Sequence, residues 1–194
     1  IVAILAYSNT LTHSYTWDDA LVIQQNEYTK AGIKGLKNIW TKKVFLHNRN
    51  VYRPVPQSIY AITYQIAPNK PNLAHFVNVL FYALAAIVTF WFLTLLFTKK
   101  NTWLLFFISL LFVLHPLHTE VVANIKSLDE ILAYLFGLLS LSYWIIFLEK
   151  KNIKNFVFTI LFFTLAILSK ISAITFLAIF PLIILFYFED IKLI

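Results

Sequence analysis

The feature that most constrains the fold of this chain is an apolar segment at 76–97, which contains 22 residues and no charge. A helix of that length crosses the hydrocarbon core of a bilayer, for which about 20 apolar residues suffice. Four further apolar segments follow, at 102–114, 131–148, 156–169 and 173–188. The segments 102–114 and 156–169 are short enough to be re-entrant. We predict that all of them are spans, because uncharged flanks extend the short ones.

The composition agrees with a membrane protein, since 60% of the residues are hydrophobic and only 13% are charged. A soluble domain carries roughly 25% charged residues. Residues 1–7 are also apolar, and the chain contains no Met. We therefore expect 1–7 to be the outer end of a first helix whose start lies upstream. The predicted fold is an all-α, polytopic membrane protein with about six transmembrane helices, treated as one truncated domain over 1–194.

The polar region at 8–73 is predicted to be a long, helical first outer loop, followed by five membrane segments at 74–190. Apolar residues recur at helical spacing at 33–43, and lysines take the other face. That pattern is typical of a helix lying in the membrane interface, and equally of a helix packed on the protein's own surface. A second helix is expected to begin near Pro54, which suits a first turn, and to be closed by Pro68 and Pro71.

The connections between the apolar segments alternate in charge. Those at 99–100 and 149–154 are short and basic, which predicts a cytoplasmic location for them. The polar region at 8–73 and the connections at 115–130 and 169–172 then share the extracytoplasmic face. This places six of the nine acidic residues at one mouth of the protein. A proton-coupled transporter is expected to hold carboxylates near the midplane instead, so the pattern favours chemistry at the outer membrane surface.

The connection at 115–130 is the stretch richest in ionisable groups. Such groups at the end of a span are costly to place there and usually serve a site. The members are His115, His118, Glu120, Lys126, Asp129 and Glu130. The two histidines would bind zinc only with a third ligand, which Asp18, Asp19 or Glu120 could supply. We assign no metal ligand, although a divalent metal stays open, and we favour a hydrogen-bonded lining. Pro116 ends or kinks the preceding helix.

Asp18 and Asp19 are adjacent carboxylates that follow the first apolar segment. One of them could act as a general base on an acceptor hydroxyl. The competing interpretation is a cap at a helix start, because an apolar run follows and Asp is favoured there. Arg53 suits bidentate binding of phosphate, or else a surface ion pair or lipid headgroup. Lys170 either snorkels to the interface or neutralises a phosphate leaving group.

The chain contains three glycines, so a nucleotide-cradling loop is improbable. No nucleic-acid partner is expected. A membrane enzyme without a nucleotide site, active on the outer face, needs a donor that is already in the bilayer. Polyprenyl-phosphate sugars meet that need.

Four stretches resemble a known family. They are Trp17-Asp18-Asp19, Tyr52-Arg53-Pro54-Val55, the run from His75 to Leu80 and the segment from His115 to Ala123, with Asp129-Glu130-Ile131-Leu132-Ala133 in register after it. The chain resembles the GT-C membrane glycosyltransferases, in particular the first half of the branch with transmembrane and tetratricopeptide-repeat segments, similar to protein O-mannosyltransferases. One departure is Ile171 after Lys170, where the family usually has an acid.

The resemblance implies transfer of a sugar, such as mannose, from a polyprenyl-phosphate donor to a hydroxyl of Ser or Thr in a protein, with inversion. Asp18 or Asp19 would take the hydroxyl proton, with Glu120 as a further catalytic candidate. The departing phosphate would meet Arg53, Lys126 and Lys170. The remaining expected lining residues are His115, His118, Asp129 and Glu130. The enzyme would work on the extracytoplasmic face of a bacterial inner membrane or an ER-type membrane. A lipid or glycan acceptor, a transporter and a non-catalytic scaffold are the alternatives.

Overall fold

The computed structural model describes residues 1–42, 44–46 and 49–192 and is built almost entirely from helices. In chain order, with η marking short 3-10 or π segments, the helices are α1 (Val2–Ala6), η1 (Ser8–Thr12), α2 (Trp17–Asp19), η2 (Ala20–Gln24), α3 (Glu27–Lys30), η3 (Gly32–Gly35), α4 (Leu36–Thr41), α5 (Pro54–Ile66), α6 (Pro71–Leu96), α7 (Thr102–Val113), α8 (His118–Ala123), η4 (Ile125–Ser127), α9 (Leu128–Lys150), α10 (Ile153–Ser169), η5 (Ile171–Ala178) and α11 (Ile179–Lys192). The all-α prediction is therefore confirmed for the bundle. A small antiparallel hairpin of β1 (Val44–Leu46) and β2 (Arg49–Val51) was not expected from the sequence.

Two helices in the described part of the chain are long and apolar enough to cross a bilayer, α6 and the helix that continues from η4 through α9. The predicted segments at 102–114, 156–169 and 173–188 form the shorter apolar helices α7, α10 and η5 with α11. These helices support the prediction that the chain is a membrane protein. The number of six spans and the GT-C arrangement stay predictions.

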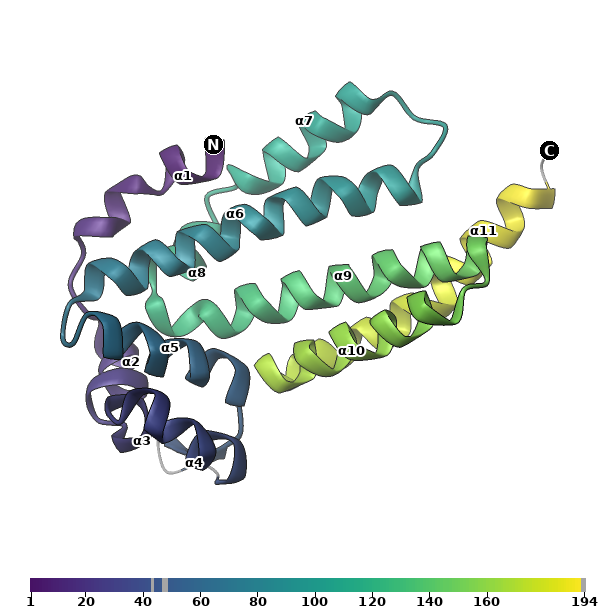
Figure 1. Cartoon of the computed structure of the whole chain (residues 1–194). Helices are drawn as coiled ribbons and strands as arrows, with labels where there is room; N and C mark the ends of the chain where they lie inside the picture. The colour runs from purple at the N-terminus through teal and green to yellow at the C-terminus, as the bar shows by residue number, and fades with distance from the viewer. Residues whose placement is uncertain (43, 47–48, 193–194) are drawn as a thin grey trace.

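Helix α9 lies between α6 and α10 and organises the bundle (Figure 1). The hydroxyl groups of Thr89 on α6 and Tyr134 on α9 are 3.0 Å apart, and Ser140 donates to the carbonyl of Thr159 on α10 at 2.8 Å. Gly137 faces Phe176 so closely that an added Cβ would lie 2.6 Å from its ring. A larger residue at 137 would therefore push η5 away from α9.

The connections fall at two opposite ends of the bundle, as the alternation in the sequence predicted (Figure 1). The α6–α7 and α9–α10 connections lie at one end. Helices α2 to α5, α8, η4 and the break between α10 and η5 lie at the other. The described residues of α2 to α5 therefore share one end of the molecule with 115–130 and 169–172.

The described part of the region at 8–73 is mostly helical apart from the hairpin of β1 and β2, and its two predicted helices need correction. Helix α5 begins with Pro54, as predicted, and ends at Ile66. Pro71 does not close it but opens α6 in its first turn, where a missing N–H costs nothing. The predicted helix at 33–43 is divided into η3 and α4, and Lys43 lies outside the described residues. Gly32 has a φ of 60°, which turns the chain just before this point.

Candidate active site at one end of the bundle

Three ion pairs gather side chains from four separate parts of the chain, and we call this set the ionic cluster. Its residues come from α2, from the start of α5, from the segment that opens α9 and from the break before η5. The pairs are Arg53 with Asp129, Lys170 with Glu130, and Lys126 with Asp18, whose Nζ and Oδ2 atoms are 3.7 Å apart. The structure thus brings together six of the ten predicted site residues.

The two adjacent aspartates are used differently. Asp19 is fully buried, and its Oδ2 accepts hydrogen bonds from the backbone N–H of Thr16 at 3.0 Å and from its hydroxyl at 2.8 Å. Its Oδ1 accepts the N–H of Lys126 at 2.7 Å. This is a capping box for α2 in which Thr16 is the N-cap and Asp19 the third helical residue, so Asp19 does stabilise a helix start, although not as the N-cap residue itself. Asp18 keeps 41% of its side chain exposed and faces the ammonium group of Lys126.

The Arg53–Asp129 pair is the most enclosed part of the ionic cluster. Asp129 is 3% exposed and lies in the first turn of α9, where the helix dipole favours an anion. Arg53 immediately precedes α5 and donates from Nη1 to Oδ2 of Asp129. The Oδ1 atom of Asp129 is buried without a hydrogen-bond partner among the described residues. Because both groups lie largely out of water, each depends on the other for its charge to be tolerated.

Lys170 occupies the break between α10 and η5, where the backbone becomes extended (φ −156°, ψ 131°). Burial lowers the pKa of its ammonium group, and the charge of Asp129 opposes this, while those of Arg53 and Lys126 add to it. Lys170 is therefore influenced by both other cations of the ionic cluster, and each of the three cations is paired with a carboxylate. A cation whose carboxylate partner can turn away into water is able to pair with an added anion.

The backbone of residues 124–126 is held by side chains that the sequence analysis did not single out. Tyr60 donates its hydroxyl to the carbonyl of Lys126 at 2.8 Å, and Asn78 donates to the carbonyl of Asn124 at 2.8 Å. Asn124 in turn accepts the N–H of Lys126 at 3.1 Å. Asn78 carried one signal in the sequence, since it is an amide inside an apolar segment. Tyr60 carried none.

The histidines lie in a different environment. His118 Nδ1 is 2.7 Å from the hydroxyl of Tyr82, and its ring packs edge-on against Phe112. Burial and then the charge of His115 lower the pKa of His118. His115 and Glu120 are exposed. In the part of the chain that the structure describes, no hydrogen bond or ion pair joins any of these three to the ionic cluster, and no three His, Asp or Glu side chains are grouped to hold a metal. Their site roles stay predictions.

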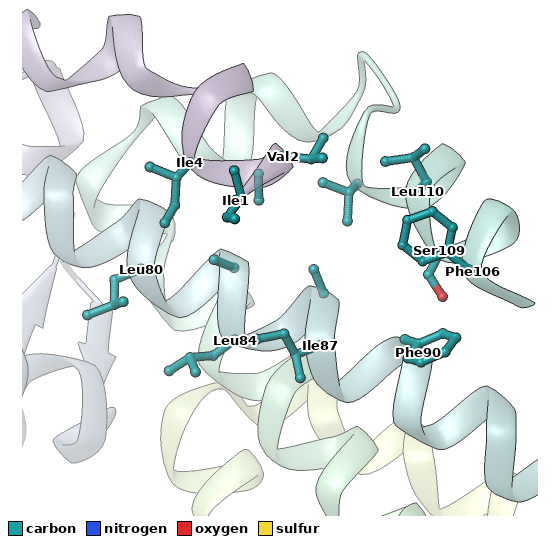
Figure 2. A pocket seen from close by; sticks show the side chains of 14 residues that line it. Ile1, Val2, Ile4, Leu80, Leu84, Ile87, Phe90, Phe106, Ser109 and Leu110 are labelled. Carbon is teal, nitrogen blue, oxygen red and sulfur yellow. The ribbon is translucent and has the colours of Figure 1, made fainter. Parts of the chain in front are cut away.

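An apolar groove of about 370 Å³ lies on another side of the molecule, between α1, α6 and α7 (Figure 2). Ile1, Leu84 and Phe106 are among the side chains that line it, and its one polar side chain, Ser109, donates to the carbonyl of Leu105. No ionisable side chain lines the groove.

The ionic cluster combines an accessible carboxylate with cations beside a buried ion pair. A carboxylate within hydrogen-bond reach of a hydroxyl can accept its proton. Fixed cations stabilise negative charge that develops on a leaving group, and they do so better where water is scarce. The arrangement therefore suits transfer of a group from a phosphate to a hydroxyl.

Comparison with known proteins gives one consistent result. The chain is 27% identical over 142 residues to the human protein O-mannosyl-transferase TMTC3, covering 71% of this chain and 15% of that protein. It is 32% identical over 146 residues to mouse protein O-mannosyl-transferase TMTC2, covering 70% and 16%. With the Caenorhabditis elegans protein O-mannosyl-transferase F38B6.6 it shares 28% identity over 179 residues, covering 88% and 24%.

The chain thus spans between 15% and 24% of the length of these relatives. No protein-family profile matches it, and no solved structure is similar to it. The curated relatives that match it at comparable significance all carry the same kind of name. The resemblance drawn from the sequence motifs is therefore confirmed, and the chain is a relative of the TMTC protein O-mannosyltransferases.

Proposed function

We propose that this chain carries the catalytic end of a membrane glycosyltransferase with a GT-C arrangement. The enzyme moves a sugar, mannose by analogy with its relatives, from a polyprenyl-phosphate donor to a Ser or Thr hydroxyl of a protein on the extracytoplasmic face. The observation that carries the proposal is the pairing of the accessible carboxylate of Asp18 with Lys126, inside an ionic cluster at one end of the bundle. The names of the relatives supply the sugar and the class of acceptor.

Asp18 is the proposed general base. It takes the proton of the acceptor hydroxyl while the hydroxyl oxygen forms a bond to C1 of the sugar. The bond from C1 to the phosphate oxygen breaks on the opposite side, so the anomeric centre inverts. Asp19 is less suited to this step, because both of its oxygens already accept hydrogen bonds from protein groups.

The departing polyprenyl phosphate gains negative charge, and Lys126, Lys170 and Arg53 are proposed to stabilise it. In the structure each of these cations is paired with a carboxylate. The two lysine pairs can open for the phosphate, because Asp18 and Glu130 are 41% and 43% exposed and their carboxylates can return to water. The Arg53–Asp129 pair is expected to stay closed, since Asp129 is buried.

The test uses the full protein in membrane vesicles, supplied with radiolabelled polyprenyl-phosphate mannose and Ser/Thr-containing acceptor peptides. We expect label on the peptide from the native protein and a strongly reduced amount from Lys126→Ala. A parallel panel of lipid and glycan acceptors addresses the alternative acceptor class. Label on the lipid or glycan acceptors alone would overturn the proposal that the acceptor is a protein. If no sugar from a panel of polyprenyl-phosphate donors reaches any acceptor, the proposal that the protein is an enzyme is overturned in favour of a non-catalytic scaffold.

A further inference from the structure

The backbone around Lys126 is held from several sides by buried side chains. The N–H of Lys126 donates to Oδ1 of Asp19 at 2.7 Å, and its carbonyl accepts the hydroxyl of Tyr60 at 2.8 Å. The same hydroxyl lies 3.2 Å from the carbonyl of Ile125. Asn78 donates to the carbonyl of Asn124 at 2.8 Å. Side chains from α2, α5 and α6 therefore fix one short turn.

These contacts link the proposed base to the proposed phosphate cation. Asp18 is the chain neighbour of Asp19, and Asp19 holds the N–H of the residue whose ammonium group faces Asp18. A lysine side chain has a long flexible stem. The position of its ammonium group therefore depends on how firmly the backbone of the lysine is held. The carbonyl side of that backbone depends on Tyr60.

Tyr60 is well suited to this task. It is 4% exposed, and burial, followed by the charges of Asp129 and Asp19, raises its pKa well above the ordinary value. The hydroxyl therefore keeps its proton and remains a donor. A buried carbonyl that loses its donor is left unsatisfied or must admit water, and the turn around Lys126 would then loosen.

We propose that Tyr60 is a positioning residue for sugar transfer, which acts through the backbone of Lys126 and does not itself touch the donor. The inference rests on the proposed function. It assigns to α5 a second contribution to the site besides Arg53 at its start. It also explains why a tyrosine hydroxyl is buried at this place, where Phe would fill the same space without a polar group.

The test is a double-variant cycle in the full protein, read as kcat/KM for polyprenyl-phosphate mannose. Tyr60→Phe removes one hydroxyl and is expected to lower kcat/KM three- to tenfold. In the background of Lys126→Ala the same change is expected to cost less than twofold, because the group that it positions is gone. Tyr7→Phe is the matched control, since Tyr7 is equally buried and donates to the carbonyl of Val113 outside the ionic cluster. It is expected to leave kcat/KM unchanged.

Two results would overturn the inference while native transfer is intact. One is an unchanged kcat/KM in Tyr60→Phe, and the other is an equal loss with and without Lys126, which would mean a general structural role. If Tyr60→Phe does not fold, Asn78→Ala enters the cycle in its place, and its loss is likewise expected to vanish without Lys126. Failure of the proposed function is a different outcome, because the native protein itself would then transfer no mannose.

Discussion

The histidine segment at 115–120 and the ionic cluster have different surroundings, although the segment is close along the chain to the three members of the cluster at 126–130. The histidine segment contains three ionisable groups within six residues, yet His118 is engaged by Tyr82 and Phe112 while His115 and Glu120 are exposed. The ionic cluster joins three residues of 126–130 in ion pairs with one residue each from α2, the start of α5 and the break before η5. The ionisable groups at 115–120 are neighbours of this stretch along the chain and still have no ion pair with it among the described residues, so convergence in space decides which of them form a cluster.

The largest effect is expected where the ionic cluster is most enclosed. Asp129→Ala leaves Arg53 without its partner, and we expect the free energy of unfolding to fall by about 3 kcal/mol, the low end for a broken buried pair, because Arg53 retains some solvent access. Thermal and chemical unfolding in detergent measures it. Glu130→Ala is the matched control, since its pair with Lys170 is more exposed and is expected to be worth at most about 1 kcal/mol. Equal losses would contradict the distinction.

A smaller effect separates the two aspartates. Asp19→Ala removes a capping box and the acceptor of the Lys126 N–H, so a loss of about 2 kcal/mol in stability is expected. Asp18→Ala should cost less than about 0.5 kcal/mol, as a surface ion pair does. The same unfolding assay measures both. A larger loss for Asp18 would reverse the roles assigned here.

The pH dependence of donor binding tests the crowding of cations. Burial lowers the pKa of Lys170. The charge of Asp129 opposes this shift, and the charges of Arg53 and Lys126 add to it. Lys170 therefore loses its proton below the ordinary pKa of 10.5. The KM for the donor should then rise several-fold as the pH rises through this lowered value, because the charged form binds phosphate. Lys170→Arg should remove the rise, since Arg stays protonated. A rise that persists in Lys170→Arg would assign the titration to another group.

Several helices were predicted from the sequence, because the length of an apolar segment and the position of a proline determine helix boundaries locally. The start of α5 at Pro54 and the long uncharged runs of α6 and α9 were predicted correctly, whereas Pro71 was assigned to the end of α5 and instead begins α6. The hairpin of β1 and β2 and the break of the helix at 33–43 were missed. Gly35 explains part of the break, because a Cβ there would lie 2.0 Å from the carbonyl oxygen of Tyr28.

The site was predicted as a set of residue types, and its internal order was not. The sequence identified both aspartates and all three cations, since charge is rare in this chain. The sequence did not indicate that both oxygens of Asp19 accept hydrogen bonds from Thr16 and from the backbone of Lys126. It also did not indicate that Tyr60 donates to the carbonyl of Lys126 in the same turn. Those assignments depend on how α2, α5 and η4 pack, which is a tertiary property.

The central claim is that Asp18 in the ionic cluster, and not an acid of the histidine segment, removes the proton from the acceptor. The direct measurement is single-turnover mannose transfer by Asp18→Asn and Glu120→Gln in the full protein, with equal amounts of folded enzyme. We predict a loss of at least about 100-fold for Asp18→Asn, as for a general base, and a loss below about threefold for Glu120→Gln. A normal rate in Asp18→Asn, with a collapse in Glu120→Gln, would contradict the account.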